Sequence, residues 1–125
     1  MTRAYLEPED VLDIHALQIS RYGGSPGVRD PGQLEAALYR PQSGYYHDLI
    51  EEAAALWESL SQNHPFVDGN KRTALASTSI FLGLNGLRLT AANEEALSFI
   101  LGLYETGEFR FEKLEPWLRA HTKQR

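Results

Sequence analysis

Apolar residues recur at intervals of three and four along most of the chain, a spacing that predicts helices rather than strands. The pattern predicts helices over residues 7–22, 29–40, 49–63 and 70–85. Another helix should follow Asn93, and a last one should carry Phe111, Leu114, Trp117 and Leu118. We therefore expect an all-α protein of about six helices, in one domain over residues 1–125.

Local signals support these boundaries. Asp30 and Pro31 are typical of an N-cap and a first helical residue, and Gly86 suits the left-handed position that follows a helix. The sequence Gly-Gly-Ser-Pro-Gly at residues 23–27 is typical of a turn. Between the helices we expect a loop or flap at residues 41–48 and a short extended piece at residues 87–90.

The apolar positions also predict which helix lies inside. The helix at 70–85 is polar for one turn and then apolar on most sides, which is typical of a buried central helix. The other helices carry narrower stripes. The helix at 49–63 presents Leu49, Ala53, Leu56, Trp57 and Leu60, and the helix capped by Asn93 carries Leu97, Ile100, Leu101 and Tyr104.

Composition narrows the functional classes. With 125 residues, of which 42% are hydrophobic and 23% charged, the chain can bury a core as one domain. A net charge of −5 argues against a general nucleic-acid binder, and the absence of cysteine excludes disulfides and thiolate chemistry. We find no apolar signal segment and no stretch of membrane-spanning length, so we expect a cytoplasmic protein.

The segment His-Pro-Phe-Val-Asp-Gly-Asn-Lys-Arg, residues 64–72, concentrates the candidate chemistry. It stands at the start of the predicted central helix, where unpaired N–H groups and the helix dipole favour an anion. Gly69 lets a ligand approach the backbone closely. Lys71 and Arg72 lie in the first helical turn, where cations are unfavourable, so a bound polyanion would compensate their cost.

The remaining polar residues of the motif supply a metal ligand, a hydrogen-bond donor and a base. Asp68 beside phosphate oxygens suits Mg²⁺, the Asn70 amide can donate to a phosphate, and His64 can act as a general base. Phe66 should anchor the loop in the core. Together these groups predict phosphoryl or nucleotidyl transfer.

Each of these residues also has a structural interpretation. Asp68 alone is more typical of an N-cap, His64 of a turn, and the two cations of a solvated face. The combination at this spacing favours the functional interpretation.

The other histidines and the tyrosines of the flap are weaker candidates for a functional site. His15 is expected in the core or at its boundary, and His47 and His121 at the surface, without the spacing of a zinc site. Tyr45 and Tyr46 in the flap can cover a ligand, although half-buried packing is the more usual role.

At residues 64–72 the chain resembles the Fic/Doc family, whose signature is H-P-F-x-[D/E]-G-N-[G/K]-R, and every fixed position is met. The similarity to the Doc branch extends over residues 19–42 and along the helix after the motif. The resemblance implies a Fic fold that binds ATP with Mg²⁺. It implies these roles: His64 as the base, Asp68 as the metal-binding acid, and Gly69, Asn70, Lys71 and Arg72 as the phosphate-binding groups.

For the Doc branch the resemblance implies a toxin that phosphorylates a threonine of elongation factor Tu and stops translation. Its partner would be an antitoxin of the Phd type that acts in trans. The self-inhibitory pattern of other family members, [S/T]-x-x-x-E-[G/N], is met only imperfectly at residues 90–95.

Three hypotheses remain: a Ser/Thr protein phosphotransferase, a Fic-type enzyme that transfers AMP to a protein hydroxyl, and a catalytically silent binding module. The intact motif speaks against the third. Lys71 and Leu75 stand where AMP-transferring members usually have a small residue and a second arginine, and this favours the first.

Overall fold

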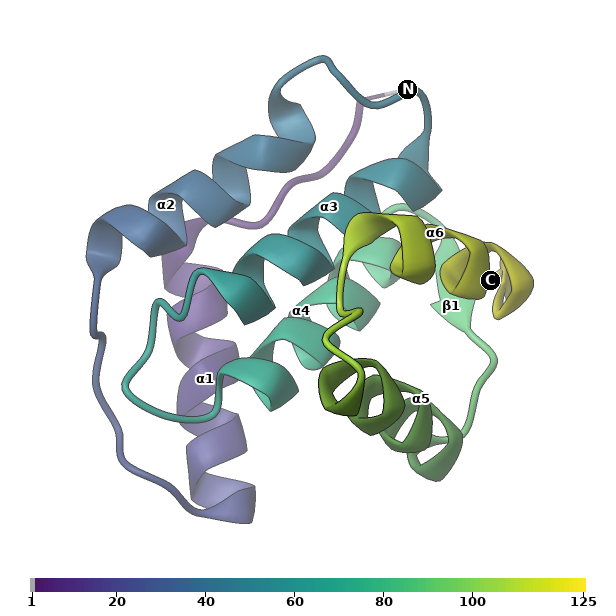
Figure 1. Ribbon diagram of the computed structural model, residues 1–125. Helices are drawn as coiled ribbons and strands as arrows, with labels where there is room; N and C mark the ends of the chain where they lie inside the picture. The colour runs from purple at the N-terminus through teal and green to yellow at the C-terminus, as the bar shows by residue number, and fades with distance from the viewer. Residues whose placement is uncertain (1) are drawn as a thin grey trace.

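The computed structural model describes residues 2–125, which form six α-helices, one short 3₁₀ helix and two short strands (Figure 1). In chain order these are α1 (Pro8–Tyr22), α2 (Pro31–Tyr39), η1 (Arg40–Gln42), α3 (Leu49–Gln62), α4 (Asn70–Leu84), β1 (Leu87–Leu89), α5 (Asn93–Glu105), α6 (Phe111–Ala120) and β2 (Thr122–Gln124). The predicted all-α class is confirmed, and the four bounded helices agree with the structure to within about two residues. Within the described chain, no helix is both long and apolar enough to cross a membrane.

Two helices share the centre of the molecule. In Figure 1, α3 and α4 lie between α2 on one side and the pair α5 and α6 on the other. The helix after the motif was expected to be the central one, and it does lie inside. However, α3 contacts α2, η1, α4 and α6, and it buries ten residues, whereas α4 buries six. The difference arises because α4 leaves one side uncovered between α1 and α5.

The core is built around Trp57 of α3, which is fully buried. Its indole lies against three aromatic rings, with centroid distances of 6.4 Å to Phe99, 5.9 Å to Phe109 and 5.7 Å to Trp117. Burial of aromatic side chains supplies a large share of a core's stabilisation. This cluster therefore joins α5 and α6 to α3 and fixes the side of the molecule opposite α1.

The short strands β1 and β2 pair antiparallel, with Leu87 opposite Gln124. The extended piece at 87–90 was predicted, but β2 was not, because its residues Thr122, Lys123 and Gln124 carry no apolar alternation. The main chain extends the contact, since the Arg125 N–H donates to the Gly86 carbonyl at 3.0 Å.

Helix α5 departs from the expectation in two ways. Its N-cap is Ala92 rather than Asn93, and no side chain caps it. Leu97 and Leu101 are 43% and 54% exposed, whereas Ile100 is buried. Only one narrow face of α5 turns toward the core, so these two leucines of its apolar stripe remain at the surface.

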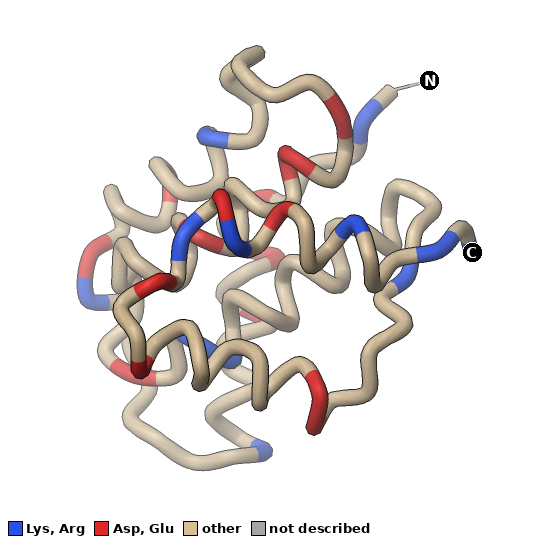
Figure 2. Tube along the Cα trace, turned by 45° about the vertical axis from the view of Figure 1, so that its right-hand side comes forward, with Lys and Arg blue, Asp and Glu red and all other residues tan. Residues whose placement is uncertain are grey.

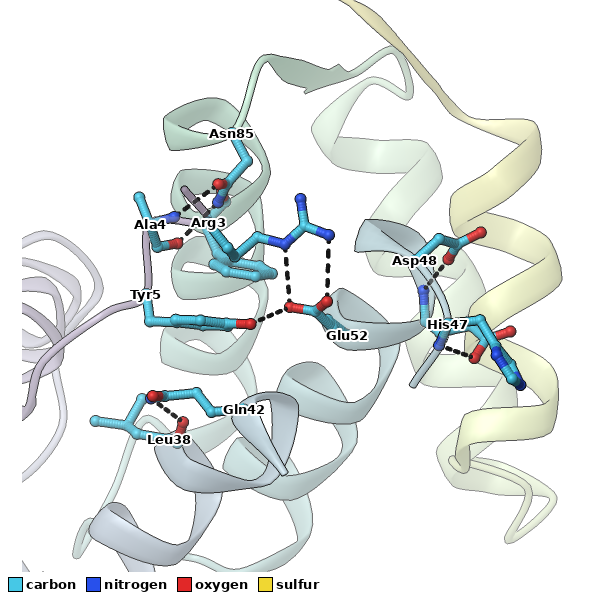
Figure 3. Close-up of polar contacts among 11 residues, drawn as sticks. Arg3, Ala4, Tyr5, Leu38, Gln42, His47, Asp48, Glu52 and Asn85 are labelled. Carbon is cyan, nitrogen blue, oxygen red and sulfur yellow. Dashed lines mark hydrogen bonds and ion pairs between the residues drawn. The ribbon is translucent and has the colours of Figure 1, made fainter. Parts of the chain in front are cut away.

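The segment before α1 is fastened to the core by polar contacts (Figure 3). The Ala4 N–H donates to Asn85 Oδ1 at 2.9 Å, and Asn85 Nδ2 donates to the Ala4 carbonyl at 2.8 Å. Glu52, only 7% exposed, accepts from Arg3 Nε and Nη2, both at 3.2 Å, and from the Tyr5 hydroxyl at 2.8 Å. Burial, and next the hydrogen bond to Glu52, raises the pKa of Tyr5.

The expected flap begins as η1 and continues without regular structure. Arg40 anchors it, because its Nε donates to the Tyr46 hydroxyl at 2.7 Å and its Nη1 contacts Glu58 at 2.5 Å. Tyr46 packs against Phe111 with 5.6 Å between ring centroids, as the packing interpretation predicted. Tyr45 is 80% exposed, so for this residue the packing interpretation was wrong.

Candidate active site

The motif at residues 64–72 forms the loop from α3 to α4 and the first turn of α4. His64 and Gly69 both have positive φ, 49° and 77°, and Gly69 is the N-cap of α4. A glycine adopts this geometry without steric cost. No side chain caps α4, so the N–H groups of its first turn face outward without an intrahelical partner.

Asn70 closes the motif loop. Its Oδ1 accepts from the Phe66 N–H and its Nδ2 donates to the Phe66 carbonyl, both at 3.0 Å. The Phe66 side chain is 1% exposed, as predicted for an anchor. The amide of Asn70 thus has a structural role that the sequence did not reveal. Because an amide carries two N–H donors, one remains for a ligand.

His15 of α1 contacts the motif loop from the core side. Its ring stacks on Phe66 with 3.8 Å between centroids, and its Nε2 donates to the Asp68 carbonyl at 2.8 Å. The side chain is 5% exposed, which confirms the core assignment. The link to the motif was missed, because the two residues lie 53 positions apart. Of the two expected surface histidines, His47 is exposed. His121 is half-buried against Trp117, so the surface assignment was wrong there.

Asp68 lies at the surface and faces the loop after α1. Its Oδ1 accepts from the Gly69 N–H at 2.9 Å and its Oδ2 from the Ser25 N–H at 3.2 Å. A Cβ at Gly24 would come within 2.8 Å of Oδ2, so glycine permits this close approach. The N-cap interpretation of Asp68 was wrong, because Gly69 holds that position.

The predicted Mg²⁺ site at Asp68 depends on which side chains near it can act as metal ligands. Within residues 2–125 there is no cluster of three or more histidine, aspartate or glutamate side chains that could hold a metal ion. A lone carboxylate such as Asp68 suits Mg²⁺, which commonly keeps several waters and takes phosphate oxygens from a substrate. It does not suit an ion that needs a cage of protein ligands. The residues present therefore fit Mg²⁺ brought by a nucleotide.

The two motif cations are exposed and lie over aromatic rings. Lys71 Nζ is 4.1 Å from the centroid of the Tyr104 ring, and Arg72 Cζ is 4.6 Å from that of Tyr22. No carboxylate in the described part of the chain pairs with either cation. Burial raises the pKa of Tyr104 to about 12. Two uncompensated cations at the positive end of α4 make this an anion-attracting surface.

Charge elsewhere is mixed. Acidic and basic positions are interspersed along the trace (Figure 2), and the pair Lys71 and Arg72 is the longest basic run within a helix. Beside Arg72 lies a cavity of about 500 Å³ between α1, α4 and α5, whose lining includes Leu17, Leu75 and Leu97. His64 does not line it.

A second segment holds the motif loop from outside. In Figure 1 the connection from α1 to α2 runs along the loop between α3 and α4. The N–H groups of Arg29 and Asp30 donate to the Pro65 carbonyl at 2.8 and 3.0 Å, and the Val67 N–H donates to the Gly27 carbonyl at 3.1 Å. The Arg29 side chain adds bonds to the carbonyls of the residues before Pro65. No local sequence signal marks this contact.

A six-helix fold with an uncapped, glycine-led helix N-terminus, an adjacent histidine and two cations without a carboxylate partner among the described residues defines a candidate anion-binding site. The chain belongs to the Fic/DOC family, whose sequence pattern matches residues 5–82. It is 47% identical over 92 residues to "Toxin Doc" of Mycolicibacterium smegmatis, an alignment that covers 70% of this chain and 68% of that protein. It is 40% identical over 96 residues to "Protein kinase doc" of Escherichia phage P1, covering 74% of this chain and 76% of the relative.

Proposed function

We propose that the protein is a Doc-like toxin that transfers the γ-phosphoryl group of ATP to a Ser/Thr hydroxyl of a target protein, with elongation factor Tu as the target. The observation that carries the proposal is the intact motif on an uncapped helix N-terminus, with two cations that have no carboxylate partner among the described residues. The similarity to a protein named as a kinase and to one named as a toxin supports the same reaction and role.

Each motif residue has a place in this reaction. His64 takes the proton of the target hydroxyl as its oxygen bonds to the γ-phosphorus, while the bond from that phosphorus to the bridging oxygen breaks and ADP leaves. Lys71, Arg72 and the N–H groups that follow Gly69 hold the phosphates. The free N–H of Asn70 adds a neutral donor. Asp68 would hold Mg²⁺, which supplies charge neutralisation on the phosphates.

The identity of the transferred group depends on two positions. Lys71 places a point charge where AMP-transferring members have a small residue, and Leu75 is half-buried beside the cavity and offers no cation. We infer that ATP presents its γ-phosphate to His64. Incubation of the protein and elongation factor Tu with ATP labelled at the α or the γ position tests this inference. Label from the γ position should enter the target, whereas label from the α position would establish AMP transfer instead.

The role of His64 is tested with His64→Ala. Loss of a general base typically lowers the rate by about 10²–10⁴. His64 is exposed, so the variant should fold and unfold like the wild type. In a bacterium, the wild type should arrest growth and His64→Ala should not. A variant that arrests growth fully would refute the assignment of the base.

We propose that neutralisation comes from a Phd-type antitoxin in trans. Within residues 2–125 no carboxylate reaches Lys71 or Arg72, and Glu94, in the imperfect inhibitory pattern, is exposed. Glu94→Gly should therefore leave toxicity unchanged, while coexpression of a small antitoxin from a neighbouring gene should restore growth. A large activation by Glu94→Gly would instead reveal self-inhibition.

A further inference from the structure

The Arg29 side chain lies across the end of α3 and has no part in the chemistry proposed so far. Its Nε donates to the His64 carbonyl at 2.6 Å and its Nη2 to the Asn63 carbonyl at 2.9 Å. Asn63 is the C-cap of α3. The last carbonyls of a helix lack intrahelical partners and attract cations through the helix dipole. The planar guanidinium satisfies the carbonyl of the C-cap Asn63 and that of the next residue, His64, at once.

The residue that Arg29 holds has an unusual conformation. His64 has a φ of 49° and is the one non-glycine residue with positive φ among residues 2–125. Left-handed geometry is disfavoured for a side chain with a Cβ, and Pro65 further biases the preceding residue toward extended geometry. Strained backbone of this kind persists only where its surroundings fix it. Some contact must therefore stabilise the strained backbone of His64. The Arg29 side chain binds the carbonyl of this residue directly.

We infer that Arg29 is a positioning residue for His64. Its guanidinium holds the carbonyls of Asn63 and His64 and thereby keeps His64 in the left-handed conformation that presents the imidazole to the target hydroxyl. The inference deepens the proposed function and rests on it for the role of His64.

Contacts other than the Arg29 side chain hold the motif loop in the fold, so the role of this side chain in positioning His64 can be tested separately. The main-chain N–H groups of Arg29 and Asp30 hold Pro65, and these bonds survive any change of the Arg29 side chain. Phe66 and Asn70 anchor the loop from inside. The Arg29 side chain is exposed, so its removal opens no cavity in the core.

The first test observes His64 without any assay of activity. The His64 Cα chemical shift and HN–Hα coupling are measured by NMR in the wild type, Arg29→Ala and Arg29→Lys. We expect the left-handed signature to be lost in Arg29→Ala and partly kept in Arg29→Lys, because a lysine reaches one carbonyl only. Arg88→Ala is the matched control, since Arg88 is exposed on β1 and has no side-chain partner among the described residues. An unchanged His64 signature in Arg29→Ala would overturn the inference.

The second test measures phosphorylation of the target. Arg29→Ala should lower kcat by roughly 10–100-fold, the scale of a misplaced catalytic group, with KM for ATP little changed. Guanidinium ion, far below denaturing concentrations, should restore part of kcat in Arg29→Ala and none in His64→Ala. A kcat that stays at the wild-type value would refute the positioning role. Absence of any His64-dependent transfer in the wild type would instead refute the proposed function, and the NMR result would still decide what Arg29 holds.

Discussion

Replacement of Asn70 by alanine tests whether the Asn70 side chain stabilises the motif loop in addition to its proposed role in binding phosphate. The Asn70 side chain makes two hydrogen bonds of 3.0 Å to the main chain of Phe66, whose side chain is buried. Alanine removes both bonds and leaves the Phe66 N–H and carbonyl without these partners. The same change also removes the donor that we assign to a phosphate.

The expected loss of stability follows from the contacts. Each hydrogen bond contributes about 0.5–1.5 kcal/mol net, and a buried polar group left without a partner costs about 1–3 kcal/mol. For Asn70→Ala we therefore expect a loss of roughly 2–4 kcal/mol in the free energy of unfolding. In a protein of 125 residues this lowers Tm by roughly 8–15 °C. Asn70→Asp should also destabilise the protein, because it keeps the acceptor for the Phe66 N–H but places a carboxylate oxygen where Asn70 Nδ2 donates to the Phe66 carbonyl.

Urea unfolding followed by circular dichroism measures these differences, provided that the m-value stays constant. Asn93→Ala is the matched control, because Asn93 also stands at the first position of a helix but makes no capping bond. It should cost no more than about 0.5 kcal/mol. If Asn70→Ala kept the stability of the wild type and lost only activity, the structural role of Asn70 in the motif loop would be refuted. Asn70 would then be a ligand-binding residue alone.

Two further perturbations address other contacts. Arg3→Met should cost about 1–3 kcal/mol in urea unfolding, because it leaves the buried Glu52 carboxylate with Tyr5 alone, and a change below about 0.3 kcal/mol would contradict this. The pKa of Tyr104, raised to about 12, implies that the unfolded chain loses this proton near pH 10 and the folded chain later, so stability should fall between about pH 10 and 12. Because solvent screens the partly exposed ring, we expect about 1–2 kcal/mol, and Tyr104→Phe should remove this part of the pH dependence.

The helices could be predicted because their signals are local. Asp30 does accept from the Gln33 N–H, Pro31 does begin α2, and Gly86 has a φ of 89° after α4. The motif was equally visible, since its nine residues are contiguous. In these cases the determining contacts lie within a few residues, although local signals were not always enough, because the N-cap interpretations of Asn93 and Asp68 were wrong.

The remaining features depend on contacts between distant residues. His15 supports Asp68 across 53 positions, and Arg29 reaches His64 across 35. From the local sequence, His15 is an ordinary residue within a predicted helix and Arg29 an ordinary residue at the start of another. The exposure of Leu101 is decided by where α5 lies against the core, which its own periodicity does not show. The tertiary half of the site was therefore not predictable from one sequence.

The C-terminal end of α4 and the turn that follows it bear on how the molecule folds. Asn85 binds Ala4, 81 positions away, and the Gly83 carbonyl accepts from Arg125 Nη1 at 3.0 Å, 42 positions away. Contacts between such distant segments close large loops and should form late in folding. Asn85→Ala should then accelerate unfolding far more than it slows folding, since only contacts already made in the transition state affect the folding rate. The turn that joins the ends of the described chain would be the last contact to form and the first to open.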